Sequence, residues 1–470
     1  MRHIDHRARW TAHVTLLAST ALSLTACSVR DNLLSPQQPG TILPGDIGSA
    51  GPAGAEALRV GALGRLQQIT AGGGNGNQST IPMLSDALTD VWKSGDTFSQ
   101  HNETDQRIVQ TNNSVLSSAY SSAQQARGFY RDAINSLKQF VPEKPAEQAE
   151  LFWAMGYTEM LMAEDFCNGI PLSETVNGVY QYTAPLTDSA VFVRALTHLD
   201  TAASLATGSD ALSISVRNAV AVTRARTLVN LNRLPEAATA VAGVPTNYQY
   251  LVTFSQTTND NNIWNLAGQV STRARFVVGD SFDTAGRIKN AIPFSSSKDP
   301  RVPTTGSPTG TGTKSIDGVT PLVAQQIWVN RNDPLVVVSG VDARLVEAEA
   351  KLRANDIVGM MTTLNALRTS PQTLGNFPVS AMAGLTVPAA GAPSIDLYFR
   401  EKAFWQFGRG PRLGDLRRLI RQYGRTQDNV FPTGTFHKNG GPPYGTDVNL
   451  PVTDNEKTNP LFTGCLDRNA

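Results

Sequence analysis

The chain has 470 residues, of which 40% are hydrophobic and 17% are charged, and its 40 Lys and Arg balance 39 Asp and Glu. This length is enough to bury a large core, and at about 150 residues per domain it suggests two or three domains. No long basic run occurs, which excludes a nucleic-acid-binding protein that relies on a basic surface. Three cysteines exclude a disulfide-dense scaffold and a four-cysteine zinc site.

The N-terminal residues 1–26 predict an export signal. A positively charged start is followed by a short apolar stretch, which is the pattern of a secretory signal peptide. The stretch ends in Leu24-Thr25-Ala26-Cys27, which resembles a bacterial lipobox, so we expect the Cys27 thiol to carry the lipid that anchors the protein to a membrane. Residue 28 is Ser rather than Asp, so the signal that retains bacterial lipoproteins in the inner membrane is absent. This absence favours the outer membrane. The alternative is plain secretion with an incidental cysteine.

Residues 27–54 are rich in Pro, Gly and Ser. This composition is typical of an extended linker, so we expect a lipidated tether that separates the membrane from a body formed by residues 55–470. Three histidines remain after residue 26, and they are His101, His198 and His437. Their wide spacing does not match the spacing of zinc ligands, and we expect neither a metal nor a cofactor.

Apolar residues recur at helical spacing in two blocks of the body, 55–244 and 341–425. The helices that this periodicity predicts span 55–69, 113–140, 145–166, 188–206, 214–231, 236–241, 341–352 and 357–368. Two pairs of them form helical hairpins with many small residues, which lets paired helices approach closely, as in tetratricopeptide-like units. We therefore expect a mainly α, tetratricopeptide-like α/α superhelix. Because no fixed 34-residue period is detectable, two unrelated hairpins are the alternative.

The segment 245–340 between the helical blocks has a different composition, with runs of Asn, Thr, Ser and Gly and only short apolar stretches. This pattern predicts a loop-rich excursion with short strands. Residues 426–470 are expected to form an irregular C-terminal segment.

Several segments, in order along the chain, resemble motifs of the SusD/RagB family of outer-membrane nutrient-binding lipoproteins. The matching segments are 163–172, Asp299-Pro300-Arg301, 347–350, 364–368, Arg400–Phe404, Gly410–Arg418 and 450–460. The resemblance implies a non-enzymatic protein at the cell surface that captures a nutrient, either a glycan or a peptide. It would then deliver this ligand to a TonB-dependent, SusC-like transporter of the outer membrane. A helical scaffold lipoprotein in outer-membrane assembly and a surface glycosidase are the alternatives.

The motifs that carry the resemblance contain charged residues with an expected structural role. Arginine and carboxylate side chains can form bidentate pairs that lock helices together, so we expect one ion network of Glu401, Arg412, Asp415 and Arg418. An anion-binding site built on Arg412 is the alternative. Export permits disulfides, and Cys167 and Cys465 lie next to turns typical of the family, so we expect these two cysteines to pair. The alternative is two buried free thiols.

Ligand-contact candidates are aromatic residues in polar surroundings, because aromatic rings stack on the apolar faces of sugars. By this criterion the candidates are Trp92, Trp264, Tyr248 and Tyr250, with ordinary loop packing as the alternative. The sequence shows no nucleophile motif, so we predict no catalytic residues. Two carboxylates that meet in space, as in a glycosidase, would leave no trace in sequence spacing.

Overall fold

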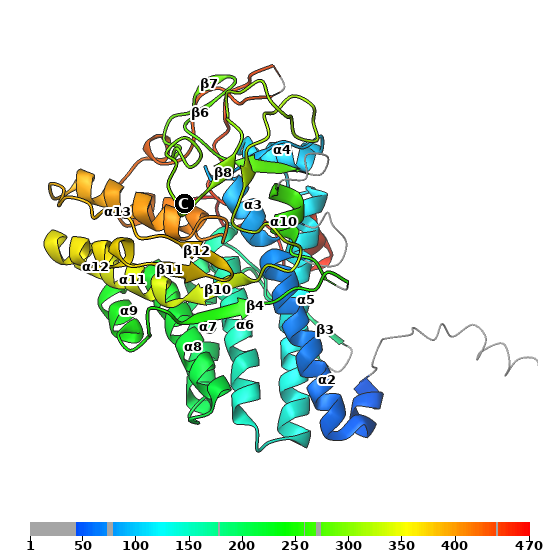
Figure 1. Ribbon diagram of the computed structural model, residues 1–470. Coiled ribbons are helices and arrows are strands. Elements are labelled where there is room, and N and C mark those ends of the chain that lie inside the picture. Colours follow the sequence, from blue (N-terminus) through cyan, green and yellow to red (C-terminus); the bar gives the residue numbers. More distant parts are fainter. Residues whose placement is uncertain (1–43, 73–78, 177–178, 258, 269–273, 439) are drawn as a thin grey trace, which may run out of the picture. The chain divides into compact units, whose positions relative to one another are not determined.

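The computed structural model describes residues 44–72, 79–176, 179–257, 259–268, 274–438 and 440–470 (Figure 1). The predicted signal peptide and Cys27 lie outside the described residues. Two units can be distinguished, residues 1–50 and residues 51–470, and apart from the first residues of helix α2 the account below concerns the second.

Helix α2 (Pro44–Ala71) occupies the end of the predicted tether. The sequence analysis expects extended chain up to residue 54, and this prediction is wrong from Pro44 onward. The helix is interrupted at Gly51, whose φ of 58° and ψ of −155° are not helical. Pro52 follows directly, where it begins a new helical segment and needs no backbone N–H donor.

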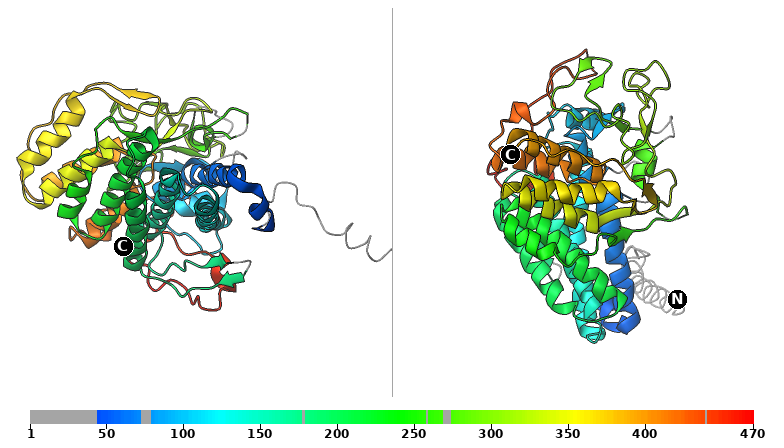
Figure 2. Two further views of the ribbon diagram at one scale, coloured as in Figure 1. Left: turned by 90° about the horizontal axis from the view of Figure 1, so that it is seen from below. Right: turned by 60° about the vertical axis from the view of Figure 1, so that its left-hand side comes forward.

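The first helical block contains α5 (Ser114–Phe140), α6 (Pro145–Asp165), α7 (Asp188–Leu205), α8 (Ala211–Asn230) and α9 (Leu234–Val241). Each helix packs on its successor, and α6 also contacts α8. Gly156 permits the close approach of α6 and α7, because a Cβ atom there would lie 2.9 Å from Leu199 Cγ. Figure 2 shows these helices arranged side by side in chain order.

The second block contains α11 (Gly340–Arg353), α12 (Ile357–Thr369), α13 (Ala392–Trp405) and α14 (Arg412–Arg421). Helix α11 packs on both α9 and α12. The two predicted hairpins therefore belong to one continuous row of helices rather than to unrelated units. The predicted tetratricopeptide-like, mainly α fold is confirmed.

The remaining elements are short. The short helices are α3 (Ile81–Ala87), α4 (Ser99–Asp105), α10 (Asn262–Ala267), η1 (Gln427–Asn429) and η2 (Asp454–Thr458). Two-stranded antiparallel pairs are formed by β1 (Trp92–Ser94) with β5 (Phe276–Val278), β2 (Glu174–Val176) with β3 (Val179–Gln181), β4 (Gln249–Val252) with β10 (Leu335–Ser339), β6 (Phe282–Asp283) with β7 (Gly286–Arg287), β8 (Thr304–Thr305) with β9 (Ala324–Gln325), and β11 (Gln372–Leu374) with β12 (Phe377–Val379). Where the structure describes it, the predicted excursion 245–340 thus consists mainly of loops and short strands, as expected, and also contains the short helix α10.

The four charged residues predicted to form one ion network belong instead to three clusters. Glu401 accepts hydrogen bonds from Arg301 at 2.7 Å and from Arg368 at 3.0 Å. Arg412 donates to both carboxylate oxygens of Asp90, at 2.7 and 2.9 Å.

The third cluster contains the one direct pair among the four predicted residues, which is Asp415 with Arg418 at 3.0 Å. Arg418 also pairs with the buried Glu349 of α11. The prediction of a single network was wrong because Asp90, Arg301 and Arg368 are far away in sequence. Since Asp90 occupies the fork of Arg412, this arginine is not available for an external anion.

Candidate ligand-binding site

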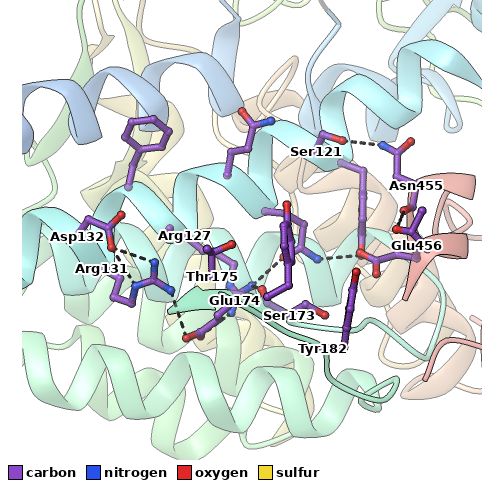
Figure 3. A pocket seen from close by; sticks show the side chains of 17 residues that line it. Ser121, Arg127, Arg131, Asp132, Ser173, Glu174, Thr175, Tyr182, Asn455 and Glu456 are labelled. Atoms are coloured by element: carbon purple, nitrogen blue, oxygen red, sulfur yellow. Dashed lines mark hydrogen bonds and ion pairs between the residues drawn. The ribbon is translucent and has the colours of Figure 1, made fainter. Parts of the chain in front are cut away.

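A pocket of about 530 Å³ lies between α5, the β2–β3 hairpin and the C-terminal helix η2 (Figure 3). This volume is in the range of pockets that bind small molecules. The three walls come from distant parts of the chain, and each is held in place by specific interactions.

One face of α5 forms the first wall. Its pocket-lining residues recur at intervals of three and four, so they share one side of the helix. On this side are Ser121, Gln124, Gln125, Gly128, Arg131 and Asp132. Gly128 is in the middle of the helix, and an added Cβ atom there would meet nothing within 4 Å. Packing therefore does not require this glycine, and its lack of a side chain leaves room in the pocket.

The β2–β3 hairpin forms the second wall and carries two exposed tyrosines. Tyr180 and Tyr182 are two positions apart along an extended chain, so their side chains leave it on the same side. Their ring centroids are 5.8 Å apart with 18° between the ring planes, which is a stacked arrangement. Tyr180 is 67% exposed and Tyr182 is 40% exposed. Thr175, the cross-strand partner of Tyr180, also lines the pocket.

The hairpin is anchored to the helices through Glu174. Its carboxylate accepts hydrogen bonds from Arg127 at 3.2 Å and from Arg194 at 2.5 Å. The same two arginines each donate to Glu159 of α6 at 3.0 Å. Burial favours the neutral form of Glu159, but the nearby His198, Arg127 and Arg194 outweigh this effect and lower its pKa to about 2. The two carboxylates and two arginines thus join α5, α6, α7 and the hairpin.

The C-terminal segment forms the third wall. Glu456 of η2 accepts a hydrogen bond of 2.9 Å from the Tyr120 hydroxyl, and Asn455 donates one of 2.6 Å to Ser121 Oγ. Burial, and then the charge of Glu456, raises the pKa of Tyr120 well above its usual value, so the phenol stays protonated as a donor. Asn459 donates to the Thr183 carbonyl at 3.0 Å, just beyond the hairpin. In the left view of Figure 2 this segment, drawn in red, lies beside the hairpin.

A disulfide bond between Cys167 and Cys465, which the sequence analysis expects to pair, ties the same segment to the end of α6. The two cysteines are 298 residues apart. At Gly169 φ is +119°, and a Cβ atom there would lie 2.6 Å from the Leu466 backbone nitrogen. A glycine is therefore needed for the C-terminal segment to pack this closely.

Comparisons with known proteins identify the architecture around this pocket. No family model and no curated protein sequence matches the chain. Solved structures do match. Surface glycan-binding protein A from Bacteroides uniformis is 13% identical, and the match covers 87% of this chain and 98% of that one with a TM-score of 0.62. A SusD superfamily protein from Parabacteroides distasonis is also 13% identical, with 88% and 98% of the chains covered and a TM-score of 0.59. The chain has the SusD-like fold.

A third solved structure with the SusD-like fold is a SusD-like carbohydrate binding protein from Bacteroides vulgatus. It is 12% identical, and the match covers 87% of this chain and 97% of that one with a TM-score of 0.58. At these identities the likeness establishes the fold alone.

The ligand-contact residues predicted from sequence do not line the pocket of this SusD-like chain. Trp92 is only 1% exposed, and its ring packs 4.8 Å from that of Phe407, so the prediction of a ligand contact there is wrong. The charged residues next to Trp92 in the sequence suggest a solvated loop, but their side chains are buried in ion pairs. Asp90 pairs with Arg412, and Lys93 lies 3.3 Å from Asp283.

The other three predicted aromatic residues are partly buried. The Tyr248 hydroxyl donates to the Ser215 carbonyl at 2.7 Å. The Tyr250 hydroxyl donates to Glu150 at 2.8 Å, and its ring centroid lies 4.1 Å from that of Trp153. Trp264 lies on α10 rather than in a loop. None of the three is among the residues that line the pocket.

Sequence reasoning missed Tyr180 and Tyr182, although a signal was present. Asn177-Gly178 is a dipeptide typical of tight hairpin turns, and it stands between two short segments rich in Val, Thr and Tyr. A hairpin with two tyrosines on one side could have been inferred from this pattern.

The structure also brings together a Ser–His–Asp chain that the sequence analysis does not detect. His101 Nε2 lies 2.9 Å from Ser79 Oγ, and His101 Nδ1 lies 2.5 Å from Asp96. Catalytic triads share this order of contacts, but they need a substrate beside the serine. His101 is completely buried here, Asp96 is 1% exposed, and Arg275 binds both oxygens of the Asp96 carboxylate. These three hydrogen-bonded side chains therefore act as a buried structural link between α3 and α4.

Within the described residues, no group of three or more His, Cys, Asp or Glu side chains is placed to hold a metal ion. None of the described helices is long and apolar enough to cross a membrane.

Proposed function

We propose that the protein binds a saccharide in the pocket between α5, the β2–β3 hairpin and η2. The observation that carries this proposal is the exposed, stacked pair Tyr180 and Tyr182 facing the polar side of α5. An aromatic face stacks on the apolar face of a sugar ring, while amides, hydroxyls and carboxylates bond to its hydroxyl groups. The names of two structural neighbours, a surface glycan-binding protein and a carbohydrate binding protein, support the same class of ligand.

Of the two ligand classes that the sequence analysis leaves open, the pocket favours the glycan over a peptide. Grooves that bind the apolar face of a peptide helix are lined by hydrophobic side chains. Most of the residues that line this pocket instead carry polar side-chain groups, with Ser121, Gln125, Asp132, Thr175 and Asn455 among them.

The N-terminal sequence and the SusD-like fold support a proposal for the wider role of this binding protein. We propose that Cys27 carries a lipid anchor, that the protein is attached to the outer membrane facing the exterior, and that it delivers its ligand to a SusC-like, TonB-dependent transporter. The protein then works by binding and transfer, without covalent chemistry.

Isothermal titration calorimetry with a panel of oligosaccharides tests saccharide binding. The chain without residues 1–26 is titrated alongside the Tyr182→Ala and Tyr180→Ala variants. We expect at least one saccharide to bind, and loss of one ring to weaken binding about tenfold or more, since stacking contributes about 1 kcal/mol beyond the buried area. Tyr248→Ala is the control with an aromatic side chain outside the pocket. Binding that survives both pocket substitutions would refute this site.

A further inference from the structure

The pocket shows a pattern of charges that distinguishes between classes of saccharide. Its lining residues include two cations, Arg127 and Arg131, and three carboxylates, Asp132, Glu174 and Glu456. No lysine or histidine is among the residues that line it. The formal charge of the lining is therefore negative.

Both arginines are already bound to carboxylates. The side chain of Arg127 is 3% exposed, and it donates to Glu159 at 3.0 Å, to Glu174 at 3.2 Å and to Gln124 Oε1 at 2.8 Å. It is too deeply buried and too fully bonded to recognise an anion in the pocket.

Arg131 is the more exposed arginine, with 24% of its side chain accessible. Its Nε and Nη2 atoms donate to Asp132 Oδ1 at 3.1 and 2.9 Å. This edge of the guanidinium is the one that chelates carboxylates and sulfates, so Asp132 occupies the position that an anionic ligand would need. On the other side Nη1 lies 3.6 Å from Glu174 (Figure 3).

The groups that remain available are suited to uncharged hydroxyls. The exposed Gln125 amide has no hydrogen-bond partner within the described part of the chain, and it can both donate and accept. Asp132 and Glu456 can accept hydrogen bonds from sugar hydroxyls. The two tyrosine rings beside them offer an apolar face.

Resting on the proposed function, we infer that the pocket selects uncharged saccharides and discriminates against uronic-acid and sulfated saccharides. A ligand carboxylate or sulfate would lie beside Asp132, Glu174 or Glu456 with no unoccupied cation to offset the repulsion. Like charges placed together at an interface cost several kcal/mol, so we expect anionic saccharides to bind at least about tenfold more weakly.

The experiment compares neutral and acidic hexasaccharides by calorimetry at low salt. The neutral probes are cellohexaose, maltohexaose, xylohexaose and mannohexaose, and the acidic probes are hexagalacturonate and hexasaccharides of hyaluronan and chondroitin sulfate. Binding of a neutral probe at least about tenfold tighter than any acidic probe is the expected result. Equal or tighter binding of an acidic probe overturns the charge selection while leaving saccharide binding intact. If no probe binds, the proposed function itself fails and the inference fails with it.

A substitution of Asp132 tests the role assigned to this residue. Asp132→Asn removes one negative charge and replaces the charge-assisted pair with Arg131 by a weaker neutral bond that an anionic ligand can displace, so the ratio of acidic to neutral affinity should rise about tenfold. The Asp132 side chain is 54% exposed, so the fold should tolerate the change. Asp396→Asn is the matched control, because Asp396 is an exposed carboxylate that pairs with Arg425 outside the pocket. An unchanged ratio in Asp132→Asn, equal to that of the control, would contradict the inference.

Discussion

The Tyr120 hydroxyl donates a hydrogen bond to Glu456 Oε1 at 2.9 Å, across 336 residues of sequence. Tyr120 is near the N-terminal end of α5 and Glu456 is in η2, so this bond connects the first and third walls of the pocket. Gln124 donates at 2.8 Å to the same hydroxyl, which orients the phenol.

Removal of this hydroxyl should destabilise the protein and loosen the pocket. Tyr120→Phe keeps the buried ring but leaves Glu456 without its donor, at a cost of about 1–2 kcal/mol. Urea unfolding measures this cost, and hydrogen exchange should show faster exchange in η2. Unchanged exchange in η2 would mean that other contacts, such as Asn455 with Ser121, hold this wall alone.

Gly128 provides a test that separates stability from ligand binding. Gly128→Ala should stabilise the protein by about 0.5–1 kcal/mol, because glycine is unfavourable in the middle of a helix and no atom obstructs the new methyl group. Gly128→Trp should fold but abolish saccharide binding, because the indole would fill the pocket.

Gly61→Trp is the matched control for Gly128→Trp. Gly61 is also in a helix, α2, with nothing within 4 Å of an added Cβ atom, and it does not line the pocket. Saccharide binding should be unchanged in this variant. Loss of binding in both variants would indicate a general effect of the indole rather than a blocked pocket.

The disulfide between Cys167 and Cys465 should contribute strongly to stability. Closing so long a loop restricts the unfolded chain, which corresponds to about 5–6 kcal/mol in the entropic model. Guanidinium unfolding of the Cys167→Ser, Cys465→Ser double variant measures the loss. Because the C-terminal segment forms a pocket wall, saccharide affinity should fall as well. An unfolding midpoint equal to that of the unsubstituted protein would show that the segment is held without the bond.

Acid should destabilise the protein through Glu159. Its pKa of about 2 in the folded state is below the ordinary value of 4.5. A lowered carboxyl pKa stabilises the fold above the unfolded pKa, and this stabilisation disappears as the pH falls from about 4.5 towards 2, by about 3 kcal/mol in total. Unfolding free energies measured across this range should therefore decline steeply.

The Glu159→Gln variant should be less stable at pH 7 and should decline less steeply below pH 4.5. Part of the remaining slope comes from Asp96. Burial alone would raise the pKa of this carboxyl, but its bonds to His101 and Arg275 lower the pKa to about 2. A slope equal to that of the unsubstituted protein would remove Glu159 as a source of acid sensitivity.

Several of the long helices could be predicted from sequence because their apolar residues recur at helical spacing and their ends carry clear signals. Helix α7 begins after Thr187, whose hydroxyl accepts a hydrogen bond from the Ala190 N–H, and the prediction places its start correctly. Such signals are local, and so they can be read without knowledge of tertiary contacts.

The pocket could not be predicted in the same way because its walls meet only in three dimensions. Nothing near Tyr120 in the sequence points to Glu456, and nothing near Glu174 points to Arg194. Trp92 illustrates the opposite error. Its charged neighbours indicate an exposed loop, whereas Asp90 and Lys93 are buried with partners supplied by α14 and β6.

The central claim is tested most directly by a crystal structure of the protein with the tightest-binding hexasaccharide of the panel. The account predicts a sugar ring against Tyr182 or Tyr180, with its hydroxyls bonded to groups on α5 and η2. Electron density for the saccharide on the excursion beside Trp264, with the pocket empty, would contradict it.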